Sequence, residues 1–128
     1  MVLFVPTPTN AAHARLVEDN ERFFLKIIEA IRAACPIADE IWCYGTNAQQ
    51  PSAPTRQWDF MCLLPAATSQ ATLMRVNALS GGLSAIQRHG VRYIDVQATI
   101  NNGNRCAASV RAEGFPIWQR ANDQRQQA

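Results

Sequence analysis

Two aspartates, Asp59 and Asp95, stand inside apolar runs that have the composition of β-strands. An ionised carboxylate is costly to bury without a partner, so each is expected at a strand end or on an open sheet face, beside a cation. Either residue could instead cap a turn or pair with an arginine. Met61 follows Asp59 by two residues, so the two side chains share one face of an extended strand.

Other reactive side chains form less specific patterns. Trp58 could stack on a base or pack in the core, and neither His13 nor His89 adjoins a cysteine or serine motif. Three arginines near the acidic segments could face a phosphate or lie in solvent: Arg56, Arg92 and Arg105. Four cysteines form no CxxC pair and no zinc spacing, and are expected as reduced thiols: Cys35, Cys43, Cys62 and Cys106.

Length and composition predict one globular domain. A chain of 128 residues can bury about two-thirds of its unfolded surface without disulfides or metals. The net charge of +2 calls for neither nucleic acid nor a membrane surface as a partner. No apolar run approaches the ~20 residues of a membrane span, and the first residues lack the basic region of a signal peptide. The expectation is a cytoplasmic protein with a domain at residues 1–119 and a polar tail at residues 120–128.

Hydrophobic periodicity predicts two long helices. Apolar residues recur at steps of three, four and seven over residues 11–34, and Pro36 ends this helix. A second helix is predicted over residues 69–89 from the same spacing. It is interrupted by Gly81-Gly82 and capped by His89-Gly90.

Short β-prone runs predict the sheet. Three strands are predicted, at residues 40–44, 58–64 and 91–100. Residues 2–5 could add a short strand, residues 47–57 read as a loop with one helical turn, and a short helix is expected around residues 105–111. The fold class is therefore a single-domain α/β (α+β) protein, with a mixed sheet of three to four strands flanked by two long helices.

The order of these segments carries a resemblance to a known family. Tyr44-Gly45-Thr46 follows a strand, Asp59-Phe60-Met61-Cys62 comes twelve residues later, and Asp95 lies on a later strand. This order resembles the nucleotidyltransferase superfamily of DNA polymerase β, above all its minimal bacterial and archaeal members. The segment 110–118, with Glu113-Gly114 before an apolar strand that ends in an aromatic residue, is similar to the closing segment of that family.

The resemblance implies a role for each motif residue. Gly45 would let the backbone approach a triphosphate, and the Thr46 hydroxyl would hold its oxygens. Asp59 and Asp95 would be the catalytic, metal-binding carboxylates. The family pairs the first of them with a second acid two residues later, and its three acids hold two Mg²⁺ ions that activate a hydroxyl and stabilise the leaving pyrophosphate.

This chain departs from the family at the second acid, where Met61 stands. Magnesium takes hard oxygen ligands, and a thioether is soft and neutral. The resemblance therefore implies at most weak binding of one Mg²⁺ ion, with Asp59 as the remnant of a metal-binding pair.

Three functions stay open at this stage. The first is a non-catalytic nucleotidyltransferase-fold protein that acts as a nucleotide sensor or a protein-binding partner. The second is an active Mg²⁺-dependent enzyme that transfers a nucleoside monophosphate from a nucleoside triphosphate to a hydroxyl. The third is an unrelated small α/β binding domain. The first two imply a nucleoside triphosphate as ligand, and the minimal core implies a separate helical partner protein or a homo-oligomer.

Overall fold

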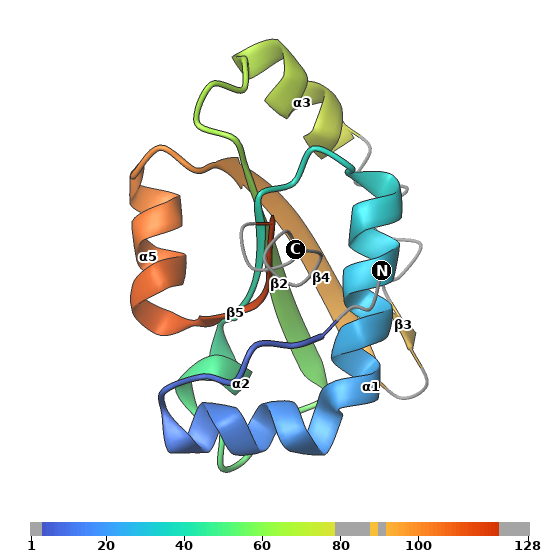
Figure 1. Ribbon diagram of the computed structural model, residues 1–128, viewed down its shortest axis with the longest axis vertical. Helices are drawn as coiled ribbons and strands as arrows, with labels where there is room; N and C mark the ends of the chain where they lie inside the picture. Colours follow the sequence, from blue (N-terminus) through green and yellow to red (C-terminus); the bar gives the residue numbers. More distant parts are fainter. Residues whose placement is uncertain (1–3, 79–87, 90–91, 121–128) are drawn as a thin grey trace, which may run out of the picture.

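A mixed sheet forms the centre of the computed structural model, which describes residues 4–78, 88–89 and 92–120 (Figure 1). The sheet has five strands in the order β3-β4-β2-β1-β5. Only β2 and β4 pair in parallel, and the other three pairs are antiparallel. The strands are β1 (Glu40–Tyr44), β2 (Gln57–Leu64), β3 (Arg88–His89), β4 (Arg92–Ile100) and β5 (Phe115–Gln119).

Helices lie on both sides of this sheet. They are α1 (Ala11–Ala34), α2 (Thr46–Gln49), α3 (Gln70–Ala78) and α5 (Arg105–Glu113). The helix predicted over residues 11–34 is confirmed at both ends. Asn10 caps it by accepting a hydrogen bond from the His13 backbone N–H, as an N-cap side chain does. Backbone angles at Asn20 are non-helical, so α1 has a kink there.

The larger core lies between α1 and one face of the sheet, which we call the α1 face. Helix α1 buries the apolar stripe that its periodicity predicted, including Phe24, Ile28 and Ile31 at 0% exposure. These side chains meet alternate residues of the central strands, such as Phe60 and Ile41. Because a strand turns alternate side chains to opposite faces, the residues between them are left for the other side of the sheet.

The opposite face, which we call the acid face because it carries Asp59 and Asp95, is covered only in part. Helix α5 lies on the side of the sheet opposite α1 (Figure 1). Ala107 and Val110 of α5 pack on Trp42, Met61 and Leu63 in a second, smaller apolar cluster. Helix α5 does not cover Asp59 and Gln57, which precede Met61 on β2, so Asp59 is half-buried and Gln57 is exposed.

The strand order confirms that the three predicted strands are neighbours, and β3 and β5 extend the sheet to five strands, where three to four were expected. The end of the helix predicted over residues 69–89 is wrong. Helix α3 is described over Gln70–Ala78 and residues 79–87 lie outside the described residues, but Arg88–His89 form β3, an antiparallel edge strand on β4. A helix cap at His89 is therefore also wrong, because pairing with β4 satisfies this backbone instead. The Gly81-Gly82 pair lies outside the described residues.

The remaining expectations concern short segments. In the described part of residues 2–5, Phe4 and Val5 form no strand. The helical turn expected within residues 47–57 is α2, and the short helix expected near residue 105 is α5. No helix within residues 4–78, 88–89 and 92–120 is long and apolar enough to cross a membrane.

Candidate functional site

Asp59 and Asp95 stand side by side on the acid face. They are Cα partners in the parallel register of β2 and β4, and register partners point to the same face of a sheet. Partial burial raises the pKa of the Asp59 carboxyl, a hydrogen bond from Gln57 opposes that effect, and the negative charge of Asp95 raises the pKa further. The net shift is upward, so the site favours a bound proton or cation beside Asp59.

Two glutamines hold the carboxylates in place. Gln57 Nε2 donates to Asp59 Oδ1 at 3.4 Å, and Gln97 Nε2 donates to Asp95 Oδ2 at 3.1 Å. Each glutamine lies two residues from its aspartate and so shares its face. Within the part of the chain that the structure describes, neither carboxylate forms an ion pair with a lysine or arginine. An aspartate–arginine pair is therefore not formed by either residue within residues 4–78, 88–89 and 92–120.

Gly45 brings the backbone against this pair of acids. It follows Tyr44, the partner of Asp59 on β1, and has a φ of 78°, which side chains other than glycine rarely adopt. A Cβ at this position would lie 2.6 Å from Asp59 Oδ2. Glycine is thus required twice, by its backbone conformation and by the nearness of the carboxylate. Thr46, the next residue, is exposed.

A buried asparagine fixes the loop that separates the glycine from the acids. Asn47 is 1% exposed. Its Oδ1 accepts hydrogen bonds from the Thr55 backbone N–H at 2.7 Å and the Thr55 hydroxyl at 3.0 Å. Its Nδ2 donates to the carbonyls of Thr55 at 3.1 Å and Gln57 at 2.8 Å. The side chain therefore ties the start of α2 to the start of β2, which keeps Gly45 beside Asp59.

Met61, which the resemblance in sequence aligns with the second acid of the family, is buried. Its exposure is 2%, and its register partners are Trp42 on β1 and Gln97 on β4. It shares the acid face with Asp59 but lies one step closer to α5, in the apolar cluster with Val110. The side chain is thus part of the packed half of this face.

Tyr44 connects the acids with the region under α5. Burial raises the pKa of its hydroxyl to about 12, and the charges of Asp59, Asp95, Cys106 and Glu113 act in the same direction. The hydroxyl is therefore neutral and available as a hydrogen-bond donor at neutral pH.

The oxygens of Asp59 and Asp95 can hold one divalent ion, because adjacent carboxylates are the ligands that Mg²⁺ prefers. They do not fit a pair of ions. No three acidic, histidine or cysteine side chains within the described ranges come together as a metal-binding group, and the buried thioether of Met61 is a poor ligand for a hard cation. Two carboxylates alone would bind one cation weakly, and the raised pKa of Asp59 favours a proton there.

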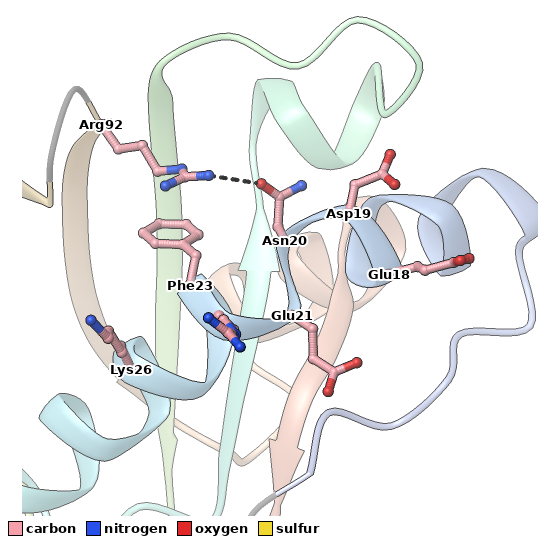
Figure 2. Close-up of a pocket in the computed structure, with 8 residues that line it drawn as sticks. Glu18, Asp19, Asn20, Glu21, Phe23, Lys26 and Arg92 are labelled. Atoms are coloured by element: carbon pink, nitrogen blue, oxygen red, sulfur yellow. Dashed lines mark hydrogen bonds between the residues drawn. The ribbon is translucent and has the colours of Figure 1, made fainter.

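Several residues considered from the sequence lie away from this site. Trp58 is 3% exposed and packs edge-on against Phe23 and Phe24 in the α1 core, so its role is packing. Arg92 faces the kink of α1, where its guanidinium lies 4.4 Å from the Phe23 ring centroid and donates to Asn20 Oδ1 at 3.1 Å (Figure 2). It is therefore turned away from the acids.

The other candidates have mixed outcomes. Arg56 is exposed in the loop before β2, and Arg105 lines a pocket on the acid face. His13 Nε2 lies 2.6 Å from the Ala48 carbonyl oxygen, so it ties α1 to α2. All four cysteines are free, and the exposed one is Cys106.

Sequence reasoning missed Asn47, Gln57 and Gln97 as parts of the site. The two glutamines could have been found, because each is two residues from an aspartate in a predicted strand. Asn47 had no comparable signal. Its four hydrogen bonds reach Thr55 and Gln57, across a loop whose path the sequence does not define.

Comparison with known proteins finds similarity in structure alone. No protein-family profile and no curated protein sequence matches this chain. A proposed nucleotidyltransferase from Sulfolobus solfataricus superposes with a TM-score of 0.54 at 14% identity, over 91% of this chain and 95% of that one.

Two complexes give lower scores. A chain in the complex of the tri-AMPylated Shewanella oneidensis HEPN toxin with the MNT antitoxin has a TM-score of 0.47 at 15% identity, over 84% of this chain and 78% of that one. A chain of a toxin–antitoxin structure with AMP-PNP has a TM-score of 0.49 at 15% identity, over 80% of this chain and 78% of that one. The Sulfolobus match carries the conclusion, which extends to the fold alone: this chain has a nucleotidyltransferase-like fold.

Proposed function

We propose that this protein binds a nucleoside triphosphate with a single divalent ion and acts as a nucleotide sensor or protein-binding partner without transferring the nucleotide. The observation that carries the proposal is Met61. It is 2% exposed and stands where a two-ion site would need a carboxylate. A metal ion at this position would lie in an apolar cluster and not among polar ligands.

Four residues would bind the ligand. Gly45 and Thr46 would contact the phosphates, since Gly45 has no side chain to keep an anion away from its backbone and lies close beside Asp59. Asp59 and Asp95 would hold the divalent ion, whose charge offsets the repulsion between them. The ion would need phosphate oxygens to complete its ligand shell, so metal and nucleotide should bind together.

The competing proposal is an active Mg²⁺-dependent nucleotidyltransferase. It is favoured by the register of Asp59 and Asp95 and by the raised pKa of Asp59, because a carboxylate with a raised pKa is a better general base. Incubation with a labelled nucleoside triphosphate and Mg²⁺ separates the two proposals. Label incorporation that Asp59→Ala abolishes would establish the enzyme and overturn the sensor.

A separate helical protein or a second copy of the chain would bind selectively to the nucleotide-bound state. Helix α3 offers an apolar contact for it, since Met74 exposes 70% of its surface. Sedimentation velocity with and without Mg²⁺ and ATP tests for the second copy, and a nucleotide-dependent change in mass is the expected result.

Binding itself is tested by titrating Mn²⁺ while following amide shifts near Asp59 and Asp95. We expect weak shifts with the ion alone and saturation at lower concentrations when ATP is present. Asp95→Asn should remove this cooperation while Asp19→Asn, an exposed site on α1, should leave it intact. Tight binding of Mn²⁺ without nucleotide would contradict a two-carboxylate site.

A further inference from the structure

A pocket lies between α5 and the acid face, beside the two carboxylates. Its volume of about 440 Å³ is within the range of about 300–1,000 Å³ for small-molecule sites. The sheet contributes Tyr44, Met61 and Gln97 to its wall, and α5 contributes the opposite wall, which includes Cys106 and Ser109. We call it the α5 pocket.

The residues of the α5 pocket adjoin those of the proposed nucleotide site. Tyr44 directly precedes Gly45 and is the register partner of Asp59. Gln97 lines the pocket and also donates to Asp95 Oδ2 at 3.1 Å. Each sheet residue of the pocket is therefore one step from a residue that would hold the phosphates or the ion.

The chemistry of its walls suits a flat ring rather than a second charged group. Met61 and Val110 form its apolar floor but are each 2% exposed, so the ring surface that a flat ligand can contact is that of the half-buried Tyr44, and aromatic rings favour stacked contacts. Arg105 and Glu113 carry opposite charges at the pocket wall, so their combined charge does not select for phosphate. A few polar groups around an apolar floor are typical of sites that orient a small ring.

We propose that the α5 pocket binds the base of the nucleoside triphosphate, with the Tyr44 ring as the surface against which the base packs. This inference rests on the proposed function, which places the phosphates at Gly45 and Thr46. The Tyr44 hydroxyl would donate a hydrogen bond to the sugar or the base.

Cys106 allows this proposal to be tested in the wild-type protein. It is the one exposed thiol of the four cysteines, and it lines the pocket. The rate of its alkylation by N-ethylmaleimide, followed by mass spectrometry, therefore reports occupancy of the pocket. The ligands are ATP and inorganic tripolyphosphate, each with Mg²⁺, and the melting temperature is measured in parallel to report binding at the phosphate site.

We expect both ligands to raise the melting temperature and ATP alone to protect Cys106. At a ligand concentration about ten times Kd, the thiol should react about tenfold more slowly with ATP. If both ligands raise the melting temperature and ATP leaves the alkylation rate unchanged, the base binds elsewhere and the proposed function survives. Protection by tripolyphosphate would show that phosphate fills the pocket, which overturns the inference. If neither ligand affects the protein, the proposed function fails and the inference falls with it.

A matched pair of variants on α5 gives a second test. Ser109 and Ala108 are adjacent and both exposed, but only Ser109 lines the pocket. Ser109→Phe should fill the pocket and weaken ATP binding by about tenfold or more, with the affinity for tripolyphosphate unchanged. Ala108→Phe should change neither affinity. Equal effects of the two substitutions on ATP binding would contradict the assignment of the base to this pocket.

Discussion

The two faces of the central sheet have opposite characters, although the same strands form both. On the α1 face, strand residues such as Ile41, Phe60 and Ile117 are at 0% exposure and meet a continuous apolar stripe of α1. On the acid face, the residues between them include Asp59, which is half-buried and forms no ion pair within the described part of the chain. Because side chains alternate along a strand, one strand can stabilise the fold with one set of residues and bind a ligand with the other.

The acid face is itself graded along β2. Leu63 is at 0% exposure and Met61 at 2%, whereas Asp59 is half-buried and Gln57 is exposed. Helix α5 covers the first two residues and leaves the last two open. Position 61 therefore belongs to the packed half of the face. This explains why an apolar residue is stable there, and why a carboxylate would need a metal ion to compensate it.

The largest expected difference between the faces is in stability. Phe60→Ala on the α1 face should lower the free energy of unfolding by about 3–5 kcal/mol, because it leaves a cavity in a packed core. Gln57→Ala, on the same strand but the acid face, should change it by about 0.5 kcal/mol or less. Urea unfolding followed by circular dichroism measures both values. Comparable losses would mean that side chains on the acid face stabilise the fold as much as those on the α1 face.

Met61→Asp tests the boundary between the packed and open halves of the acid face. The buried charge should destabilise the free protein by about 2–4 kcal/mol, whereas Met61→Leu should cost less than about 1.5 kcal/mol. Mg²⁺ with ATP should recover part of the loss in Met61→Asp, since a ligand that binds only the folded state raises the melting temperature. A thermal melt of each variant, with and without ligands, measures this. If Met61→Asp gains no more from the ligands than wild type, position 61 is not a vestigial metal position.

The elements that the sequence predicted well are those whose signal is local. Helix α1 was predicted from the spacing of its own apolar residues, and the three central strands from their own β-prone runs. The end of the second helix was wrong because Arg88–His89 are held as a strand by pairing with Tyr93 and Arg92. Two residues on a sheet edge carry no periodicity of their own, so tertiary pairing decided their structure.

In the candidate site, too, the sequence predicted what has a local signal and missed what depends on tertiary pairing. Asp59 and Asp95 were selected because carboxylates are unusual in apolar runs, and their order along the chain matched a known family. Their position side by side depends on the parallel register of β2 and β4, which alternation alone does not define. The α5 pocket was not predicted at all, because its two walls come from strands and a helix far apart in sequence.

Gly45→Ala should separate binding from stability at the edge of the acid face. Gly45 and Gly103 both have a positive φ, 78° and 75°, so alanine at either position should cost stability through backbone strain, about 1–3 kcal/mol at Gly45, whose ψ of −157° lies in a region that only glycine adopts readily. A Cβ at Gly45 would also lie 2.6 Å from Asp59 Oδ2, whereas one at Gly103 would meet nothing within 4 Å.

The Asp59 side chain can rotate away from the new Cβ. The contact between them should therefore add little to the loss of stability that backbone strain causes in Gly45→Ala. Its displacement should, however, abolish the joint binding of Mn²⁺ and ATP. Calorimetric titration of the two variants compares their affinities, with Gly103→Ala as the matched control. Loss of binding in both variants would assign the effect to backbone strain rather than to Asp59.

The smallest expected effect concerns the charge of Asp59. Its pKa is raised in the folded protein above the usual 3.8, so folding disfavours the ionised form. The stability that the protonated form contributes is fully present below pH 3.8 and is lost as the pH rises through the folded pKa. At pH 7, Asp59→Asn should therefore be as stable as wild type or more stable, by about 0.5 kcal/mol, and this advantage should disappear in acid. Chemical unfolding at a series of pH values follows the difference.

Glu40 on the same face provides a control of opposite sign. Burial raises the pKa of its carboxyl, but hydrogen bonds from Trp42, Gln119 and Arg111 and the charge of Arg111 outweigh that effect and lower the pKa below 4.5. Its contribution is present above pH 4.5 and is lost as the pH falls through the folded pKa. Glu40→Gln should therefore destabilise the protein at pH 7 by about 1–2 kcal/mol, with the difference closing in acid. If both variants shift stability in the same direction at pH 7, the charge of Asp59 is already balanced by other groups in the free protein. An unbalanced charge at Asp59 would then give no support to ligand binding on the acid face.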